Sequence, residues 1–380
     1  MCVSTARQFQ LLFAYYAMRI ISLFLLSMLL SGCNKGHHDQ RGSAGEFIRG
    51  VYGNPGALLK GGYRLDSLGV NAVFVRSASL NRSFFDTARA QGCKIFVEFP
   101  TLNGKEYLED HPEAWPIDEE GEPSPPADWF LGICPTHEGF KAHRIQELKT
   151  LLAEYEVDGI FMDYFHLHAQ FETPEPILPE TCFCDRCTSL FASHVEKDIQ
   201  GATIRARAEW ILDNLDSEWR SWRSHLVNTW AEDLGAVVKE YRPNALLGVY
   251  HCAWYAKEYD VALYRILGID VGELAARVDV LSPMLYHEMM NRPATWVSEY
   301  IKWLDELTQA SIHGRPKIWP IVQAHNKPGI ITAEEFREVM VNGAHAPSSG
   351  IMMFSEVSLL QDPDKIEVMK ELYHTFQTNK

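Results

Sequence analysis

The strongest constraint on the fold is an alternation of short apolar runs with stretches of helical spacing, repeated along most of the chain. Apolar runs bounded by turn residues are typical of buried strands, and apolar residues three or four positions apart are typical of helices. Eight such pairs predict an α/β protein with a (β/α)₈ TIM-barrel fold. The predicted strands cover 47–52, 72–76, 94–100, 159–165, 246–251, 278–286, 317–323 and 350–356.

A doubly wound open sheet is the alternative fold for such an alternation. The sequence after the first strand, Tyr52-Gly-Asn-Pro-Gly56, lacks the glycine spacing of a dinucleotide-binding turn, and no phosphate-binding loop motif occurs. The barrel is therefore favoured. Helices are predicted over 83–91, 140–156, a long stretch within 189–241, 261–276, 294–310, 333–344 and 364–377, with a weak helix over 55–68.

Two of the loops that follow strands are long, over 101–137 after the third strand and 166–188 after the fourth. Loops that follow barrel strands lie on the carboxyl-terminal face, where barrel enzymes have their active sites. Long loops of this kind are usually functional or disordered. We therefore expect both loops to lie above the mouth of the barrel.

The N-terminus is a targeting segment rather than part of the fold. Residues 11–30 are almost all apolar and end in Leu30-Ser-Gly-Cys33, followed by polar residues. This pattern resembles a bacterial lipoprotein signal peptide with its lipobox, which implies a signal over 1–33, lipidation of Cys33 and a polar tether over 34–45. It places the protein in the bacterial cell envelope, anchored to the membrane by lipid. An uncleaved membrane anchor is the alternative.

The remaining residues, 46–380, are predicted to form one catalytic barrel. The formal net charge of the chain is −15. Proteins that follow a phosphate backbone are normally basic, so nucleic acid is excluded as a partner.

Carboxylates stand at the ends of several predicted strands. Asp163 ends the fourth strand after the apolar run Ile160-Phe-Met162, where an acid has no packing role. Cleavage of a glycosidic bond usually needs two carboxyl groups, one ionised and one protonated. Asp163 is our candidate for the ionised group. Glu288 and Glu356 are the candidate partners, and Glu98 is a weaker candidate that we assign to substrate binding.

Three patches resemble uncharacterised glycoside hydrolases whose barrel is shared with α-L-fucosidases, α-amylases and family 42 β-galactosidases. They are His111-Pro-Glu-Ala-Trp115, Val157-Asp-Gly-Ile-Phe-Met-Asp163 and Cys182-Phe-Cys-Asp-Arg-Cys187. The resemblance covers 47–360 and implies that Asp163 occupies the place of the catalytic nucleophile. The chain lacks the asparagine–glutamate pair that family 42 enzymes carry on strand four, so the cysteines and the catalytic pattern indicate different relatives.

Polar and aromatic side chains near the other strand ends are candidates for substrate binding. Histidine and tyrosine can orient sugar hydroxyls, and aromatic rings can stack on the apolar faces of sugars. Each could instead be a structural residue. Besides Glu98, the candidates are Trp115, Tyr164, His166, His251, Trp254, Tyr286 and His287.

The cysteines Cys182, Cys184 and Cys187 have the spacing of metal-binding thiolates. Similarity to family 42 suggests Cys134 as the fourth ligand of a structural zinc. Disulfide pairing in an oxidising compartment is the alternative. We predict no cofactor for catalysis. The function predicted from the sequence is hydrolysis of a glycan in the cell envelope, and the alternative is a glycan-binding lipoprotein that does not catalyse.

Overall fold

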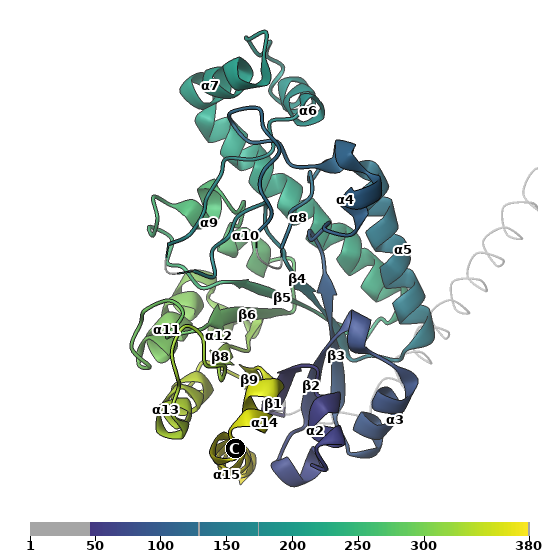
Figure 1. Ribbon diagram of the computed structural model, residues 1–380, viewed down its shortest axis with the longest axis vertical. Coiled ribbons are helices and arrows are strands. Elements are labelled where there is room, and N and C mark those ends of the chain that lie inside the picture. The colour runs from purple at the N-terminus through teal and green to yellow at the C-terminus, as the bar shows by residue number, and fades with distance from the viewer. Residues whose placement is uncertain (1–45, 128–129, 174, 379–380) are drawn as a thin grey trace, which may run out of the picture. The chain divides into compact units, whose positions relative to one another are not determined.

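The computed structural model describes residues 46–127, 130–173 and 175–378. In these residues nine parallel strands form one sheet, which closes into a barrel where β5 pairs with β6 (Figure 1). The predicted (β/α)₈ barrel is confirmed. The strands are β1 (Ile48–Gly53), β2 (Ala72–Arg76), β3 (Lys94–Pro100), β4 (Gly159–Asp163), β5 (Leu246–Cys252), β6 (Val280–Leu285), β7 (Lys317–Ile318), β8 (Ile321–Gln323) and β9 (Gly350–Phe354).

The seventh stave of the barrel is interrupted, so the described strands form eight staves. β7 pairs with the start of β6, whereas β8 pairs with the end of β6 and with β9. Trp319 and Pro320 lie between β7 and β8, and a proline has no N–H to contribute to a ladder. The single strand predicted over 317–323 is therefore two short strands.

Aromatic rings fill the interior of the barrel. Phe74, Phe96, Phe161 and Trp319 contact one another with ring centroids 4.9–6.3 Å apart. Gly248 on β5 gives the rings room, because a Cβ atom there would lie 2.4 Å from the ring of Phe161. The rings form an apolar floor beneath the polar side chains at the strand ends.

Helices follow most strands, as predicted. They are α2 (Gly56–Lys60), α3 (Arg82–Ala90), α4 (Tyr107–Asp110), α5 (Glu138–Glu154), α6 (Asp185–Val195), α7 (Ile204–Asn214), α8 (Asp216–Tyr241), α9 (Ala262–Arg265), α10 (Val271–Ala275), α11 (Trp296–Thr308), α12 (Ala310–His313), α13 (Ala333–Ala344), α14 (Glu356–Gln361) and α15 (Pro363–Thr378).

Two predicted helices are wrong in extent. The long helix expected within 189–241 is three helices, because Glu196 and Gly201 adopt positive φ angles after α6 and Leu215 separates α7 from α8. The helix expected over 261–276 divides into α9 and α10 at Gly268, which has a φ of 72°. Positive φ ends a helix, and glycine adopts it without steric cost.

A second, smaller hydrophobic core lies apart from the barrel core. It consists of Cys134, Cys182, Phe183, Cys187, Phe191, Ala208, Ile211, Leu215, Trp219 and Trp222. We call this core, with α6, α7 and the first half of α8, the cysteine cap (Figure 1). Further along α8, Val227, Trp230 and Leu234 belong to the barrel core. One continuous helix thus contributes to both cores.

The predicted signal peptide, Cys33 and the tether over 34–45 lie outside the described residues. Within residues 46–378, no described helix is both long enough and apolar enough to span a bilayer.

Candidate active site

The strand ends open into a cavity of about 700 Å³. The ends of β1 to β5 contribute Tyr52, Arg76, Glu98, Asp163 and Tyr250 to its lining. The two long loops contribute side chains too, which include Phe130 from the first and His166 from the second. The cavity therefore lies where a barrel enzyme binds its substrate.

Two carboxyl groups meet in this cavity at one tyrosine. The Tyr52 hydroxyl oxygen lies 3.1 Å from Glu98 Oε2 and 3.2 Å from Asp163 Oδ2. The two carboxyl groups also share a hydrogen bond with each other. The strand register explains their approach, because Asp163 is paired with Pro100, two residues beyond Glu98 on β3. Both side chains therefore point to the same side of the sheet.

The electrostatics of the pair favour one proton shared by two acids. Burial, the charge of Asp163 and the hydrogen bond between them raise the pKa of Glu98 to about 8. Burial also raises the pKa of Asp163, but the N–H of Tyr164, at 2.8 Å from Oδ1, and the Tyr52 hydroxyl oppose this rise. Arg76 Nε lies 3.4 Å from Glu98 Oε2. At neutral pH, Glu98 holds the proton and Asp163 is ionised.

Two histidines on neighbouring staves present acceptors to the cavity lining. Nδ1 of His166 lies 2.7 Å from the carbonyl of Leu167, and Nδ1 of His251 lies 3.0 Å from the carbonyl of Cys252. A carbonyl only accepts, so each Nδ1 carries the hydrogen and each Nε2 is left as an acceptor. Burial lowers the pKa of both rings to about 4, so both are neutral under ordinary conditions.

The structure places the two predicted partner acids, Glu288 and Glu356, outside the lining of this cavity. Glu356 begins α14 and is 1% exposed, with its Oε2 packed so close to Gly53 that a Cβ there would lie 2.1 Å away. Glu288 follows β6, and its backbone N–H donates to Gln323 Oε1 at 3.1 Å. Among the described residues, Glu98 is the acid that approaches Asp163 through Tyr52.

The remaining predicted residues divide into two groups. Tyr164, His166, His251 and Tyr286 line the cavity. His287 instead pairs with Glu335 Oε1 at 2.9 Å, and Trp254 packs behind the wall against Phe171 and Tyr259. Trp115 donates from Nε1 to the carbonyl of Ser124 at 2.8 Å, also outside the lining.

Sequence reasoning missed several residues of the lining. Tyr52, Arg76, Phe130, Glu172, Tyr250, His325 and Lys327 belong to it. The strand residues among them carried a signal, because Tyr52 and Arg76 end predicted strands and Tyr250 is the last residue but one of another. Phe130, Glu172 and Lys327 lie in loops, whose path the sequence does not give.

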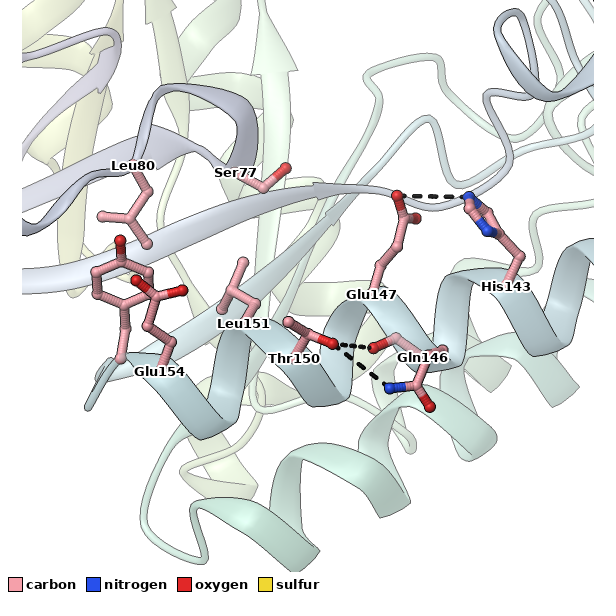
Figure 2. A pocket seen from close by; sticks show the side chains of 9 residues that line it. Ser77, Leu80, His143, Gln146, Glu147, Thr150, Leu151 and Glu154 are labelled. Atoms are coloured by element: carbon pink, nitrogen blue, oxygen red, sulfur yellow. Dashed lines mark hydrogen bonds and ion pairs between the residues drawn. The ribbon is translucent and has the colours of Figure 1, made fainter.

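A second hollow, of about 460 Å³, lies on the barrel flank between α5 and the loop after β2 (Figure 2). Figure 2 shows His143 pointing toward Glu147 and Gln146 toward Thr150 along one face of α5. Ser77 lines both hollows. The flank hollow lacks a pair of buried acids, so the cavity at the strand ends is the candidate active site.

Four cysteines meet in the cysteine cap. The Sγ atom of Cys134 lies 3.5 Å from that of Cys187 and 3.7 Å from that of Cys184, and all four Sγ atoms, with Cys182, lie within 4.8 Å of one another. Tetrahedral zinc with Zn–S bonds of about 2.3 Å separates its sulfur ligands by about 3.8 Å. None of the six described cysteines forms a disulfide in this structure, since a disulfide needs sulfurs about 2.05 Å apart.

Donors around the four sulfurs suit thiolates. The N–H of Ile117 donates to Cys182 Sγ, and the N–H of Cys187 donates to Cys184 Sγ, each at 3.4 Å. Arg186 donates from Nε to Thr136 Oγ1, which lies 3.2 Å from Cys187 Sγ. This donor set fits a closed metal site with four thiolate ligands.

Neither a protein-family model nor a curated protein sequence matches this chain. Solved structures match at low identity. The glycoside hydrolase domain of PgaB from Bordetella bronchiseptica has a TM-score of 0.64 at 13% identity, over 88% of this chain and all of that one.

Two longer enzymes also match. A β-galactosidase from Marinomonas ef1 has a TM-score of 0.62 at 11% identity, over 86% of this chain and 59% of that one. α-L-Fucosidase isoenzyme 2 from Paenibacillus thiaminolyticus has a TM-score of 0.55 at 11% identity, over 87% and 49%.

The chain has the fold of glycoside hydrolases. At these identities the likeness concerns the fold, and this chain spans between half and three fifths of the length of the galactosidase and the fucosidase.

Proposed function

We propose that the protein is a glycoside hydrolase that cleaves O-glycosidic bonds of a glycan in the bacterial cell envelope. One observation carries the proposal. A protonated and an ionised carboxyl group, Glu98 and Asp163, meet at Tyr52 in a cavity at the carboxyl ends of the barrel strands. This is where barrel enzymes place their chemistry, and a carboxylate kept ionised beside a neutral acid can serve as the nucleophile or base that glycoside hydrolysis requires. The likeness in fold to known glycoside hydrolases supports the reaction class.

In the proposed reaction Asp163 supplies the electron pair. Its carboxylate either bonds to the anomeric carbon or removes a proton from the water that attacks that carbon. The Tyr164 N–H, the Tyr52 hydroxyl and the proton on Glu98 hold Asp163 in place and keep it ionised. The lone pairs on Nε2 of His166 and His251 would accept hydrogen bonds from sugar hydroxyls.

The test is turnover of a glycan panel, followed by detection of new reducing ends. The wild-type protein should release reducing ends from at least one glycan, and Asp163→Asn should release none above background. Asp86→Asn, on the exposed side of α3, removes an acid far from the cavity and should leave the rate unchanged. Sugar binding without turnover by the wild-type protein would instead identify a glycan-binding barrel.

We also propose that Cys134, Cys182, Cys184 and Cys187 hold a structural zinc ion, which would join the ends of the two long loops. The mutual distances of their sulfur atoms support this proposal. Four protein ligands leave no open position for water, so the ion would stabilise the cap and take no part in the reaction. The proposed lipid anchor at Cys33 would hold the enzyme at a membrane of the envelope.

A further inference from the structure

The two acids at Tyr52 act from one side of the cavity. Glu98 and Asp163 come from neighbouring strands, share a hydrogen bond and approach the same phenol oxygen. Glycoside hydrolysis usually needs two carboxyl groups that flank the scissile bond, about 5 Å apart for retention of configuration or about 6.5–9.5 Å apart for inversion. A pair that exchanges one proton cannot flank a sugar ring. The acid that protonates the leaving oxygen must therefore come from another wall.

Among the described residues, three carboxyl groups line the cavity, and the third belongs to Glu172. It lies in the long loop after β4, directly after Phe171, whose ring packs against His166 and Trp254 at 5.0 and 6.0 Å. Gln170 and Ile177 exchange two backbone hydrogen bonds of 2.9 Å. The buried Phe171 and this bridge fix the base of the loop, and the half-buried Glu172 faces the cavity.

The electrostatic surroundings separate Glu172 from the other two acids. Burial raises the pKa of Tyr286, and the charge of Glu172 contributes more to this rise than the charges of Asp163 and Glu98. Tyr286 follows β6, which is three staves around the barrel from β3. Of the three acids, Glu172 thus acts most strongly on Tyr286 after β6, and it also acts on Tyr164 beside Asp163.

We propose that Glu172, the third carboxyl group of the cavity lining, is the catalytic acid that protonates the leaving oxygen. This inference rests on the proposed function and names the acid residue that the proposed function does not identify. The proton of the Glu172 carboxyl moves to the glycosidic oxygen as the C–O bond breaks and its electron pair stays on that oxygen. As described above, Asp163 either bonds to the anomeric carbon or takes a proton from the water that attacks it. One water provides the hydroxyl of the new reducing end. Its proton returns to Glu172 if Asp163 bonded to the sugar; if Asp163 took that proton instead, it releases it to solvent and Glu172 regains one from solvent.

The test compares two leaving groups in the same variant. Dinitrophenolate leaves its glycosides without a proton, whereas the methoxy group of a methyl glycoside needs one to leave. Glu172→Gln should lower kcat/KM by at least about 100-fold for the methyl glycoside and by less than about 10-fold for the dinitrophenyl glycoside. Glu172→Asp, which moves the carboxyl by one methylene, should fall between. Glu175→Gln removes an exposed acid from the same loop and should change neither rate.

Each outcome decides a different question. If the wild-type protein cleaves no glycoside of a panel in both anomeric forms, the proposed function fails, and this inference fails with it. If the wild-type protein is active and Glu172→Gln keeps its rate on methyl glycosides, this inference alone is overturned. Equal slowing on both leaving groups would also overturn it, because a binding or packing role does not depend on the leaving group.

Discussion

The barrel and the cysteine cap are held together by different means. The barrel core draws side chains from every strand, and most of them are fully buried. The cap core has ten buried side chains, three of which are the cysteines Cys134, Cys182 and Cys187. A core of that size rarely suffices by itself, and small domains often need a metal or disulfides. The comparison predicts that the barrel tolerates losses that the cap does not.

Two features connect the regions. Helix α8 contributes Trp219 to the cap core and Trp230 to the barrel core. Near the junction, Glu180 accepts hydrogen bonds from Arg223 at 2.8 Å and from Arg265 at 3.1 Å, and Arg220 lies 3.4 Å away. Arg223 is 1% exposed, and its other amino group donates to the carbonyl of Ile266.

The largest effect is expected from removal of the proposed zinc. Binding of structural zinc to zinc-finger peptides is worth about 10–16 kcal/mol, so loss of the ion should open the cap. Cys187→Ser should contain no zinc by elemental analysis and should show increased hydrogen exchange in α6 and α7 but not in β1 to β4. Cys93→Ala, at a buried cysteine outside the cluster, should retain one zinc per chain. A wild-type protein without zinc would contradict the metal proposal.

The next largest effect concerns the barrel alone. Asp163→Asn should lower kcat by at least about 1,000-fold, which corresponds to about 4 kcal/mol of transition-state stabilisation. It should leave the zinc content and the melting of the cap unchanged. A loss of zinc in this variant would mean that the two regions are not independent.

At the junction, Glu180→Ala should lower the free energy of unfolding by about 3–5 kcal/mol, because it leaves the buried Arg223 without its carboxylate. Urea unfolding measures this change. Glu218→Ala removes the exposed pair with Lys197 and should cost less than about 1 kcal/mol. A similar loss of unfolding free energy in both variants would show that burial of the junction does not add to the stability of the protein.

The stability of the protein should depend on pH through Glu98. The pKa of Glu98 is raised to about 8 from its usual 4.5, so the folded protein keeps a proton that the unfolded chain releases. Its contribution to stability is full below pH 4.5 and is lost as pH rises toward 8, at up to about 1.4 kcal/mol per pH unit. Glu98→Gln should therefore gain stability over the wild-type protein between pH 5 and 8, as thermal melting can measure. Parallel pH profiles for the two proteins would contradict the assignment.

The smallest effect is expected from Tyr52→Phe. The phenol oxygen is one of several donors to the acid pair, and its loss should lower kcat by about 10-fold. The alkaline limb of the rate profile should also move, because the hydrogen bond of Tyr52 lowers the pKa of Glu98. An unchanged profile would show that Tyr52 does not touch the acids in solution.

The sequence was informative where local pattern decides structure. All eight staves and Asp163 at the end of β4 follow from apolar runs and strand ends. The choice among Glu98, Glu288 and Glu356 did not follow from the sequence. It depends on the register between strands and on which loop folds over which side chain. Glu356 ends an apolar strand in the sequence, yet the chain turns into α14 at this residue and buries its carboxyl. Glu172 lies in a loop, where the sequence has no periodic pattern from which its position could be predicted.

The aromatic floor has a consequence for how a long substrate would meet this molecule. Phe74, Phe96, Phe161 and Trp319 are at most 2% exposed and leave no passage along the barrel axis. Reactants and products must use the same opening, so a polymer cannot thread through the protein as through a pore. A chain longer than the cavity would have to lie across the rim, with its ends in solvent on either side.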